Sequence, residues 1–315
     1  MYKNMSEIIL ITGGTGLVGT AIRHLVDDAA NCIFLSSTDF DLSDIEQTRL
    51  AFETYEPKYV IHLAACVGGL FKNMNNKVEM LEKNIQINYN VVKCCHDYSV
   101  KKIIACLSTC IFPDQTTYPI NETMLHNGPP HSSNDTYAYA KRMLHTHCKA
   151  YRDIHGDNFI CIIPTNIYGP ADNYSLEDGH VIPSLIHKCY LAKQNGEDFV
   201  VRGTGSPLRQ FIYSGDLAKI IMRLLSYYND DEVIVSVSES AEVSIADVAR
   251  IIAEKFEYGN RIRFDSSYSD GQYKKTADNS KLMSLIGDDY KFTEISDGIN
   301  RSIDWFTANY STARK

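Results

Sequence analysis

The feature that most constrains the fold is a short apolar run, residues 8–12, which leads directly into the stretch Gly13-Gly14-Thr15-Gly16-Leu17-Val18-Gly19. An apolar run of this length that ends in glycine is typical of a buried strand. Residues 20–28 follow with apolar side chains at helical spacing. A tight glycine turn between a buried strand and a helix predicts the first unit of an α/β sheet.

The same alternation continues along the chain. We expect further strands at residues 32–35, 59–63, 102–107 and 158–163, and further helices at 44–55, 78–98, 137–154, 212–228 and 297–310. Strands that alternate with helices pair in parallel, because each connection must cross over one face of the sheet. The expected fold class is therefore α/β, a doubly wound parallel sheet of the Rossmann-like kind.

Composition and charge exclude several classes of function. A formal net charge of -8 argues against a nucleic-acid partner, which would require a basic face. No stretch of about 18 apolar residues predicts a membrane span, and the polar start lacks a signal core, so we expect a cytoplasmic protein. The nine cysteines are odd in number and irregularly spaced, without a Cys-x-x-Cys pair, which predicts neither a disulfide framework nor a metal site.

The glycine turn indicates a dinucleotide cofactor. Glycine lets the backbone approach a pyrophosphate closely, and the following helix directs its free N–H groups and positive dipole end at the phosphates. NAD-specific sites usually carry an acid at the end of the second strand, where this chain has Ser36 and Ser37. Because no arginine stands there either, the residues alone favour NADPH only slightly. Asp41 and Leu42 are expected to border the adenine.

Domain organisation follows from the change of pattern after Pro164, where glycines divide the chain into shorter segments. We assign residues 1–168 to the dinucleotide-binding domain, to which residues 211–237 return. Residues 169–210 and 238–315 are expected to form a smaller substrate-binding lobe.

Tyr137 and Lys141 are four residues apart on an expected helix, so their side chains lie on one face. An ammonium beside a phenol favours the phenolate and lowers the pKa of the phenol from its usual value of about 10. Such a pair can exchange a proton with a substrate carbonyl while Lys141 holds the nicotinamide ribose. Ser108, at the end of the expected strand 102–107, is placed to bond the same carbonyl.

The glycine turn, Ser108, Tyr137 and Lys141 together resemble the extended short-chain dehydrogenase/reductase family. Within that family the resemblance is to enzymes that remodel GDP-linked deoxy sugars. The motifs that carry it are residues 64–69 (AACVGG), 108–113 (STCIFP), 164–170 (PTNIYGP), 180–183 (HVIP) and 203–211 (GTGSPLRQF). It continues through Asp270-Gly271 and covers essentially the whole chain.

The resemblance implies a substrate and a two-part reaction. GDP-4-keto-6-deoxy-D-mannose is inverted at C3 and C5, and NADPH then reduces its C4 ketone to give GDP-L-fucose. The ketone acidifies the neighbouring C–H bonds, and inversion needs a base on one face and an acid on the other. Cys110 and His180 match the family's base and acid, with unperturbed pKa values of about 8.5 and 6.5. The enolate oxygen would be held by Tyr137 and Ser108.

The resemblance also implies further binding residues and a partner. Besides the glycine turn, the cofactor contacts would be Ala64, Ala65, Leu107, Lys141, Pro164, Asn166, Ile167 and His180. The nucleotide sugar would contact Lys188, Arg202, Arg209 and Asp270. Arg202 stands where many relatives carry tryptophan, so stacking there would come from a guanidinium plane. The implied oligomer is a homodimer formed by helices 78–98 and 137–154, with Val91, Val92, Met143 and Leu144 as candidate contacts.

Two other classes of function stay open. A nucleotide-sugar 4,6-dehydratase would carry an Asp-Glu pair where this chain has Cys110-Ile111, and a 4-epimerase would consume no NADPH. A non-catalytic, cofactor-sensing regulator on the same fold commonly lacks the tyrosine or the lysine, and both are present here.

Overall fold

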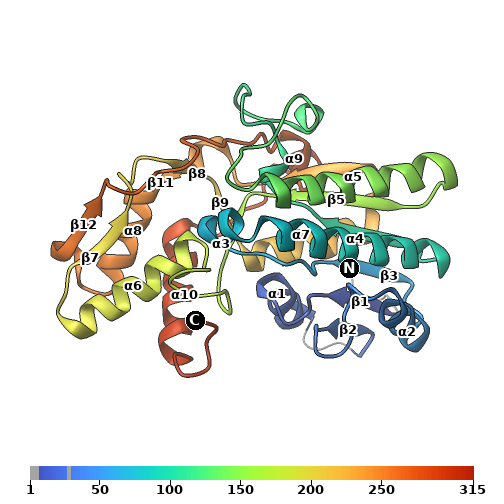
Figure 1. The fold of residues 1–315 in the computed structure, drawn as a ribbon, viewed down its shortest axis with the longest axis horizontal. Helices are drawn as coiled ribbons and strands as arrows, with labels where there is room; N and C mark the ends of the chain where they lie inside the picture. Colours follow the sequence, from blue (N-terminus) through green and yellow to red (C-terminus); the bar gives the residue numbers. More distant parts are fainter. Residues whose placement is uncertain (1–6, 27–29) are drawn as a thin grey trace.

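Six parallel strands form the central sheet of the computed structural model, which describes residues 7–26 and 30–315 (Figure 1). Their order is β10-β5-β4-β3-β1-β2. The bounds are β1 Ile9–Thr12, β2 Cys32–Leu35, β3 Tyr59–His62, β4 Lys102–Cys106, β5 Phe159–Pro164 and β10 Glu232–Val235. The doubly wound α/β fold expected from the sequence is confirmed.

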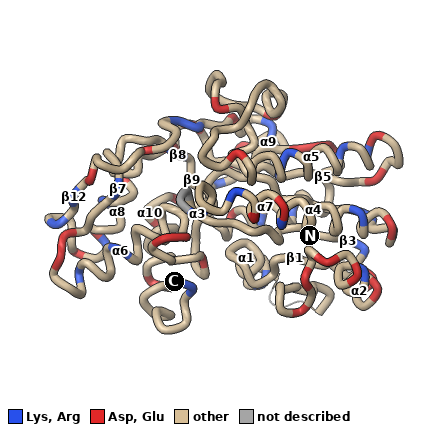
Figure 2. The backbone as a smooth tube through the Cα atoms, viewed as in Figure 1, with Lys and Arg blue, Asp and Glu red and all other residues tan. Residues whose placement is uncertain are grey.

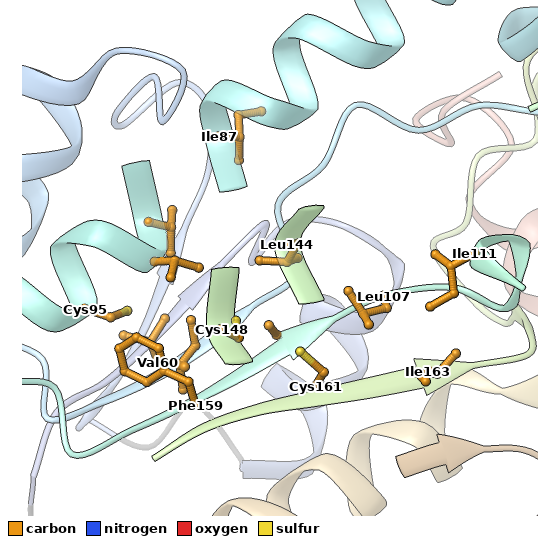
Figure 3. Close-up of a cluster of buried hydrophobic side chains, with 14 of the residues drawn as sticks. Val60, Ile87, Cys95, Leu107, Ile111, Leu144, Cys148, Phe159, Cys161 and Ile163 are labelled. Carbon is orange, nitrogen blue, oxygen red and sulfur yellow. The ribbon is translucent and has the colours of Figure 1, made fainter. Parts of the chain in front are cut away.

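Helices cover both faces of this sheet, because successive side chains of each strand point to opposite faces. On β5, Phe159, Cys161 and Ile163 pack into one core cluster, and Ile160 and Ile162 pack into another. The first cluster is covered by α2 (Ile45–Tyr55), α4 (Lys77–Asp97) and α5 (Asp135–His155), as Figure 3 shows in part. The second is covered by α1 (Leu17–Val26), α7 (Ser214–Tyr227) and α9 (Ser280–Ile286).

The second lobe is built from small two-stranded sheets and three long helices. Its strand pairs are β6 (Asn166–Tyr168) with β9 (Phe211–Tyr213), β7 (Phe199–Arg202) with β12 (Ile262–Asp265), and β8 (Leu208–Arg209) with β11 (Val243–Ser244). Its helices α6 (Val181–Asn195), α8 (Ile245–Lys255) and α10 (Ile295–Ala308) surround a separate apolar core. The remaining short elements are α3 Leu70–Asn75 and the 3-10 turns Thr109–Ile111, Glu122–Met124, Glu239–Ala241 and Gly259–Arg261.

Three local expectations differ from the structure. Residues 212 and 213, expected to open a helix, belong to β9 instead, because their backbone pairs with β6. Leu50 is an apolar residue of the expected helix 44–55 and so a candidate for its buried face, but it is exposed, since α2 packs through Ala51 and Phe52. The first helix begins at Leu17, inside the glycine motif, and the end expected for it at residue 28 lies outside the described residues.

The arrangement of the sheet defines one edge where a ligand can bind. β1 and β3 are neighbours, but the helices that follow them lie on opposite faces, which leaves a crevice at their carboxyl ends. Acidic and basic residues occur together on the outer helices α2, α4 and α5 (Figure 2). None of the helices within residues 7–26 and 30–315 is long and apolar enough to cross a bilayer.

Candidate active site

A cavity of about 1110 Å³ lies where the carboxyl ends of the central strands face the second lobe. It brings together residues that are distant in the sequence, as expected for a ligand site at this sheet edge. The sequence-predicted residues that line it are Gly13, Thr15, Gly16, Leu17, Val18, Gly19, Asp41, Leu42, Ala64, Ala65, Leu107, Ser108, Tyr137, Lys141, Pro164, Asn166, Ile167, His180, Lys188, Arg202, Arg209 and Asp270. Gly14 and Cys110 are absent from this lining.

The glycine turn allows no side chain at its closest approaches. Gly13 has a φ of +68°, and a Cβ there would lie 2.9 Å from the Ala64 nitrogen. A Cβ on Gly19 would lie 2.6 Å from the Gly13 oxygen, so helix α1 starts directly against the turn. Gly14 faces the other way, against Phe34 of β2, which explains why it does not line the cavity. This backbone-lined pocket at a helix N-terminus fits the pyrophosphate of a dinucleotide.

The two acidic side chains that follow β2 accept hydrogen bonds from nearby serines. The Asp39 carboxylate accepts hydrogen bonds from the Ser36 hydroxyl at 2.6 Å and from its backbone N–H at 2.8 Å. Asp41 accepts from the hydroxyl and the N–H of Ser43. These bonds lower the pKa of both carboxyls, so both stay ionised but already have partners. Ser36 and Ser37 line the cavity at this point.

Lys141 is almost fully buried, and its Nζ donates a 2.7 Å hydrogen bond to the Cys106 carbonyl. Its Nζ lies 5.9 Å from the centre of the Tyr137 ring. Contrary to the expectation of a lowered value, burial raises the pKa of Tyr137 well above its usual range, and the thiols of Cys110, Cys106 and Cys66 add to this. Tyr137 is therefore a protonated phenol at neutral pH, ready to donate rather than accept a proton.

Cys110 lies in the 3-10 turn Thr109–Ile111, is buried, and follows Ser108 and Thr109, which both line the cavity. Its backbone N–H donates to the Ser108 hydroxyl at 3.4 Å. Burial raises the pKa of the thiol, whereas the nearby Lys275 ammonium and a hydrogen bond with Ser108 lower it. The thiol therefore does not keep the unperturbed pKa assumed from the sequence. His180 is at the N-cap of α6 and exposed on the same cavity as Tyr137.

Three of the residues expected to contact the nucleotide sugar already interact with their own chain. Arg209 donates to the carbonyls of Leu208 and Gln272 at 2.7 and 2.5 Å. Asp270 accepts from the N–H and the hydroxyl of Thr204, each at 2.7 Å. The Arg202 guanidinium lies 4.7 Å from the centre of the Tyr268 ring. Arg202 stands where tryptophan was expected from the resemblance, and its guanidinium plane is held by this contact with the Tyr268 ring.

Comparison with known proteins identifies the family. The sequence profile described as the NAD dependent epimerase/dehydratase family matches residues 9–237. The chain belongs to that family. The extended short-chain dehydrogenase/reductase resemblance seen in the sequence is thereby confirmed.

Individual members of the epimerase/dehydratase family match the chain over nearly its whole length. A GDP-L-fucose synthase of Dictyostelium discoideum is 55% identical, with 98% of this chain and 97% of that one covered. A probable GDP-L-fucose synthase of Drosophila melanogaster is 46% identical, with 98% and 99% covered. The crystal structure of a GDP-L-fucose synthetase from Naegleria fowleri bound to NADP is 47% identical, with a TM-score of 0.93 and 99% and 96% covered.

Two charged residues of this epimerase/dehydratase site escaped the sequence reasoning. Lys275 lies near the Cys110 thiol, and Asp172 is a buried carboxyl near His180. The segment of Lys275 is fixed by Ile120, whose N–H donates to Thr276 at 2.9 Å and whose carbonyl accepts from Asp278 at 2.8 Å. No periodicity or motif marks these residues, because their positions depend on contacts between remote segments.

Proposed function

We propose that the chain carries out the reaction of a GDP-L-fucose synthase. It inverts C3 and C5 of GDP-4-keto-6-deoxy-D-mannose and reduces the C4 ketone with NADPH to give GDP-L-fucose. The observation that carries this is one cavity that joins Ser108, Tyr137, Lys141 and His180, with Cys110 next in the chain to the lining residue Thr109 and close enough to Tyr137 to raise its pKa. Relatives of that name at 55% and 46% identity over nearly the full length support the same reaction.

The cofactor residues hold an NADP(H) molecule along the floor of the cavity. The glycine turn receives the pyrophosphate, and Asp41 and Leu42 border the adenine, whereas Lys141 bonds the nicotinamide ribose. Bound NADPH supplies the hydride for the ketone carbon. Ser36 and Ser37, which line the cavity there, carry no negative charge that would repel a 2′-phosphate, and the related synthetase that was crystallised with NADP supports this preference.

The phenol of Tyr137 supplies the proton in the reduction. Because burial holds its pKa high, the phenol keeps its proton until negative charge develops on the C4 oxygen. Ser108 donates a second hydrogen bond to that oxygen, so the same pair stabilises the enolate during inversion. Burial lowers the pKa of Lys141, and its hydrogen bond to the Cys106 carbonyl fixes the Nζ beside the site.

Inversion uses Cys110 as the base and His180 as the acid. The Cys110 thiolate takes the proton from the carbon beside the ketone, and the His180 imidazolium returns one to the opposite face. The Lys275 ammonium and the Ser108 hydrogen bond favour the thiolate against the effect of burial. Lys188, Arg202, Arg209 and Asp270 line the part of the cavity proposed for the GDP moiety.

The test is incubation of the protein with GDP-4-keto-6-deoxy-D-mannose and NADPH, with identification of the product by NMR. Wild-type protein should give GDP-L-fucose, and Cys110→Ser and His180→Asn should reduce the ketone without completing both inversions. Cys189→Ser, at a cysteine buried in the second lobe, is the matched control for the thiol. Wild-type activity in both site variants would contradict the assigned acid and base.

The homodimer, the cytoplasmic location and the domain boundaries stay predictions. Of the residues expected on the dimer face, Val91, Val92 and Leu144 are fully buried in the subunit core, because α4 and α5 pack against each other and the sheet. Met143 is exposed, as are Tyr89 and Tyr139 on the same two helices. We propose that these exposed side chains form the dimer contact. Sedimentation of a Met143→Glu variant as a monomer, with wild type a dimer, would support it, whereas a monomeric wild type would exclude it.

A further inference from the structure

Asp172 is a buried carboxyl on the loop between β6 and α6, and it lines the active-site cavity. Its Oδ1 accepts a 2.7 Å hydrogen bond from the N–H of the next residue, Asn173. Among the described residues, its Oδ2 is buried without a hydrogen-bond partner. Leaving a buried carboxylate oxygen unpaired costs free energy, so such a group in a ligand cavity calls for an explanation.

The loop folds back on itself and brings its two ends together. The Gly179 N–H donates to the Ser175 carbonyl at 3.1 Å, and a Cβ on Gly179 would lie 2.7 Å from the Asn173 carbonyl. This contact joins the residue before His180 to the residue after Asp172, and the His180 charge lowers the pKa of the Asp172 carboxyl, so the two side chains are near each other. Both line the same cavity.

The backbone that presents Asp172 is held in an unusual conformation. Ala171 has a φ of 63°, the left-handed region that a residue with a Cβ rarely adopts. Its carbonyl accepts a 2.7 Å hydrogen bond from Arg314, whose own carbonyl accepts from the Tyr174 N–H at 2.7 Å. Strained backbone of this kind is most often retained at functional sites.

Two neighbouring side chains, His180 and Arg314, favour the ionised form of the Asp172 carboxyl. Burial raises the pKa of the Asp172 carboxyl, and the charges of His180 and Arg314 lower it. Tyr174 is the other titratable neighbour, and the Asp172 charge helps to raise the pKa of that phenol. His180 and Arg314 both line the cavity, but Arg314 already donates to the Ala171 carbonyl, so we take an imidazole N–H of His180 as the donor to Oδ2.

We propose that Asp172 is a positioning residue for His180, whose imidazole donates one N–H to the free Oδ2 while its other nitrogen delivers a proton to the sugar. This rests on the proposed function. The imidazolium loses the proton that forms the new C–H bond, the enolate returns to the ketone, and the ring is left neutral. Asp172 stays a carboxylate throughout and fixes the orientation of the ring, an arrangement in which contacts tighten when substrate binds.

The test separates proton transfer from hydride transfer. In the presence of NADP⁺, the C3 and C5 hydrogens of GDP-4-keto-6-deoxy-D-mannose should exchange with deuterated solvent. The rate of this exchange, followed by NMR, reports the acid–base steps. Oxidation of GDP-L-fucose by NADP⁺, followed by the absorbance of NADPH, reports the hydride step alone. We expect Asp172→Asn to slow the exchange by on the order of 10-fold or more and to leave the hydride step within about 2-fold of wild type.

A double variant decides whether Asp172 acts through His180. In a His180→Asn background, Asp172→Asn should have no further effect on the residual exchange. Glu254→Gln, which removes an exposed carboxylate from α8, outside the lining of the cavity, is the control and should match wild type in both assays. Thermal denaturation checks folding, and Asp172→Ser replaces the asparagine variant if that variant does not fold.

Two results would overturn the inference. One is exchange at the wild-type rate in the Asp172 variant, and the other is an equal loss in both backgrounds, which would mean that Asp172 bonds the sugar itself. Either result leaves the proposed function intact as long as the wild type makes GDP-L-fucose. A wild type that forms no such product would instead refute the proposed function.

Discussion

Replacing Gln210 by leucine should destabilise the protein and loosen the segment that carries Lys275. Gln210 is buried between β8 and β9, and its amide makes three hydrogen bonds to backbone groups. Nε2 donates to the carbonyls of Val237 and Ala277 at 2.9 and 3.1 Å, and Oε1 accepts from the Ala277 N–H at 2.7 Å. The same amide therefore holds the segment that carries Lys275.

The magnitude follows from the three groups that lose their partner. A buried backbone donor or acceptor left unpaired costs about 1–3 kcal/mol, and leucine restores part of this through apolar burial. We expect the free energy of unfolding to fall by about 3 kcal/mol. For a chain of 315 residues, that corresponds to a decrease in Tm of roughly 5 °C.

Calorimetry and cofactor titration together check this expectation. Tm should fall in Gln210→Leu, and the solvent exchange that depends on Cys110 should slow, because Lys275 loses its fixed position. NADPH affinity should stay near the wild-type value, since the glycine turn lies in a different part of the cavity lining. Gln194→Leu, at an exposed position of α6, is the matched control and should leave Tm within about 1 °C. An unchanged Tm in Gln210→Leu would refute the reasoning.

Three further changes test other parts of the structure. Gly19→Ala should abolish NADPH binding in a fluorescence titration, because its Cβ would lie 2.6 Å from the Gly13 oxygen. Burial lowers the pKa of His62 to about 3, so below pH 6.5 the unfolded chain binds a proton that the native chain does not. The free energy of unfolding, measured by urea titration, should therefore fall by about 1.4 kcal/mol per pH unit below 6.5, and this slope should be smaller in His62→Gln. Lys102→Met should lower the free energy of unfolding by about 2 kcal/mol, because Lys102 Nζ donates to two carbonyls at the end of α7. Lys101→Met, at an exposed lysine, is the control and should change the free energy of unfolding little.

Local sequence patterns determined the fold class and much of the active site. A helix places residues four apart on one face whatever surrounds it, so Tyr137 and Lys141 were recognisable as a pair. A glycine turn between a buried strand and a helix has few structural solutions, and it gave the cofactor pocket. The strands and helices of the first half were predicted within a few residues, because each has its own periodicity.

Burial and charge at the site were decided by the tertiary structure. The sequence suggested a lowered pKa for Tyr137, but the surrounding protein raises it. Val91, Val92 and Leu144 were expected to face outward, but the packing of α4 on α5 buries them.

The sequence by itself therefore determined which elements form and which residue types the reaction uses. Only the tertiary structure decided that Lys275 stands near Cys110 and Asp172 near His180. The physical reason is that secondary structure depends on neighbours along the chain, whereas desolvation and electrostatic interactions depend on distance in space.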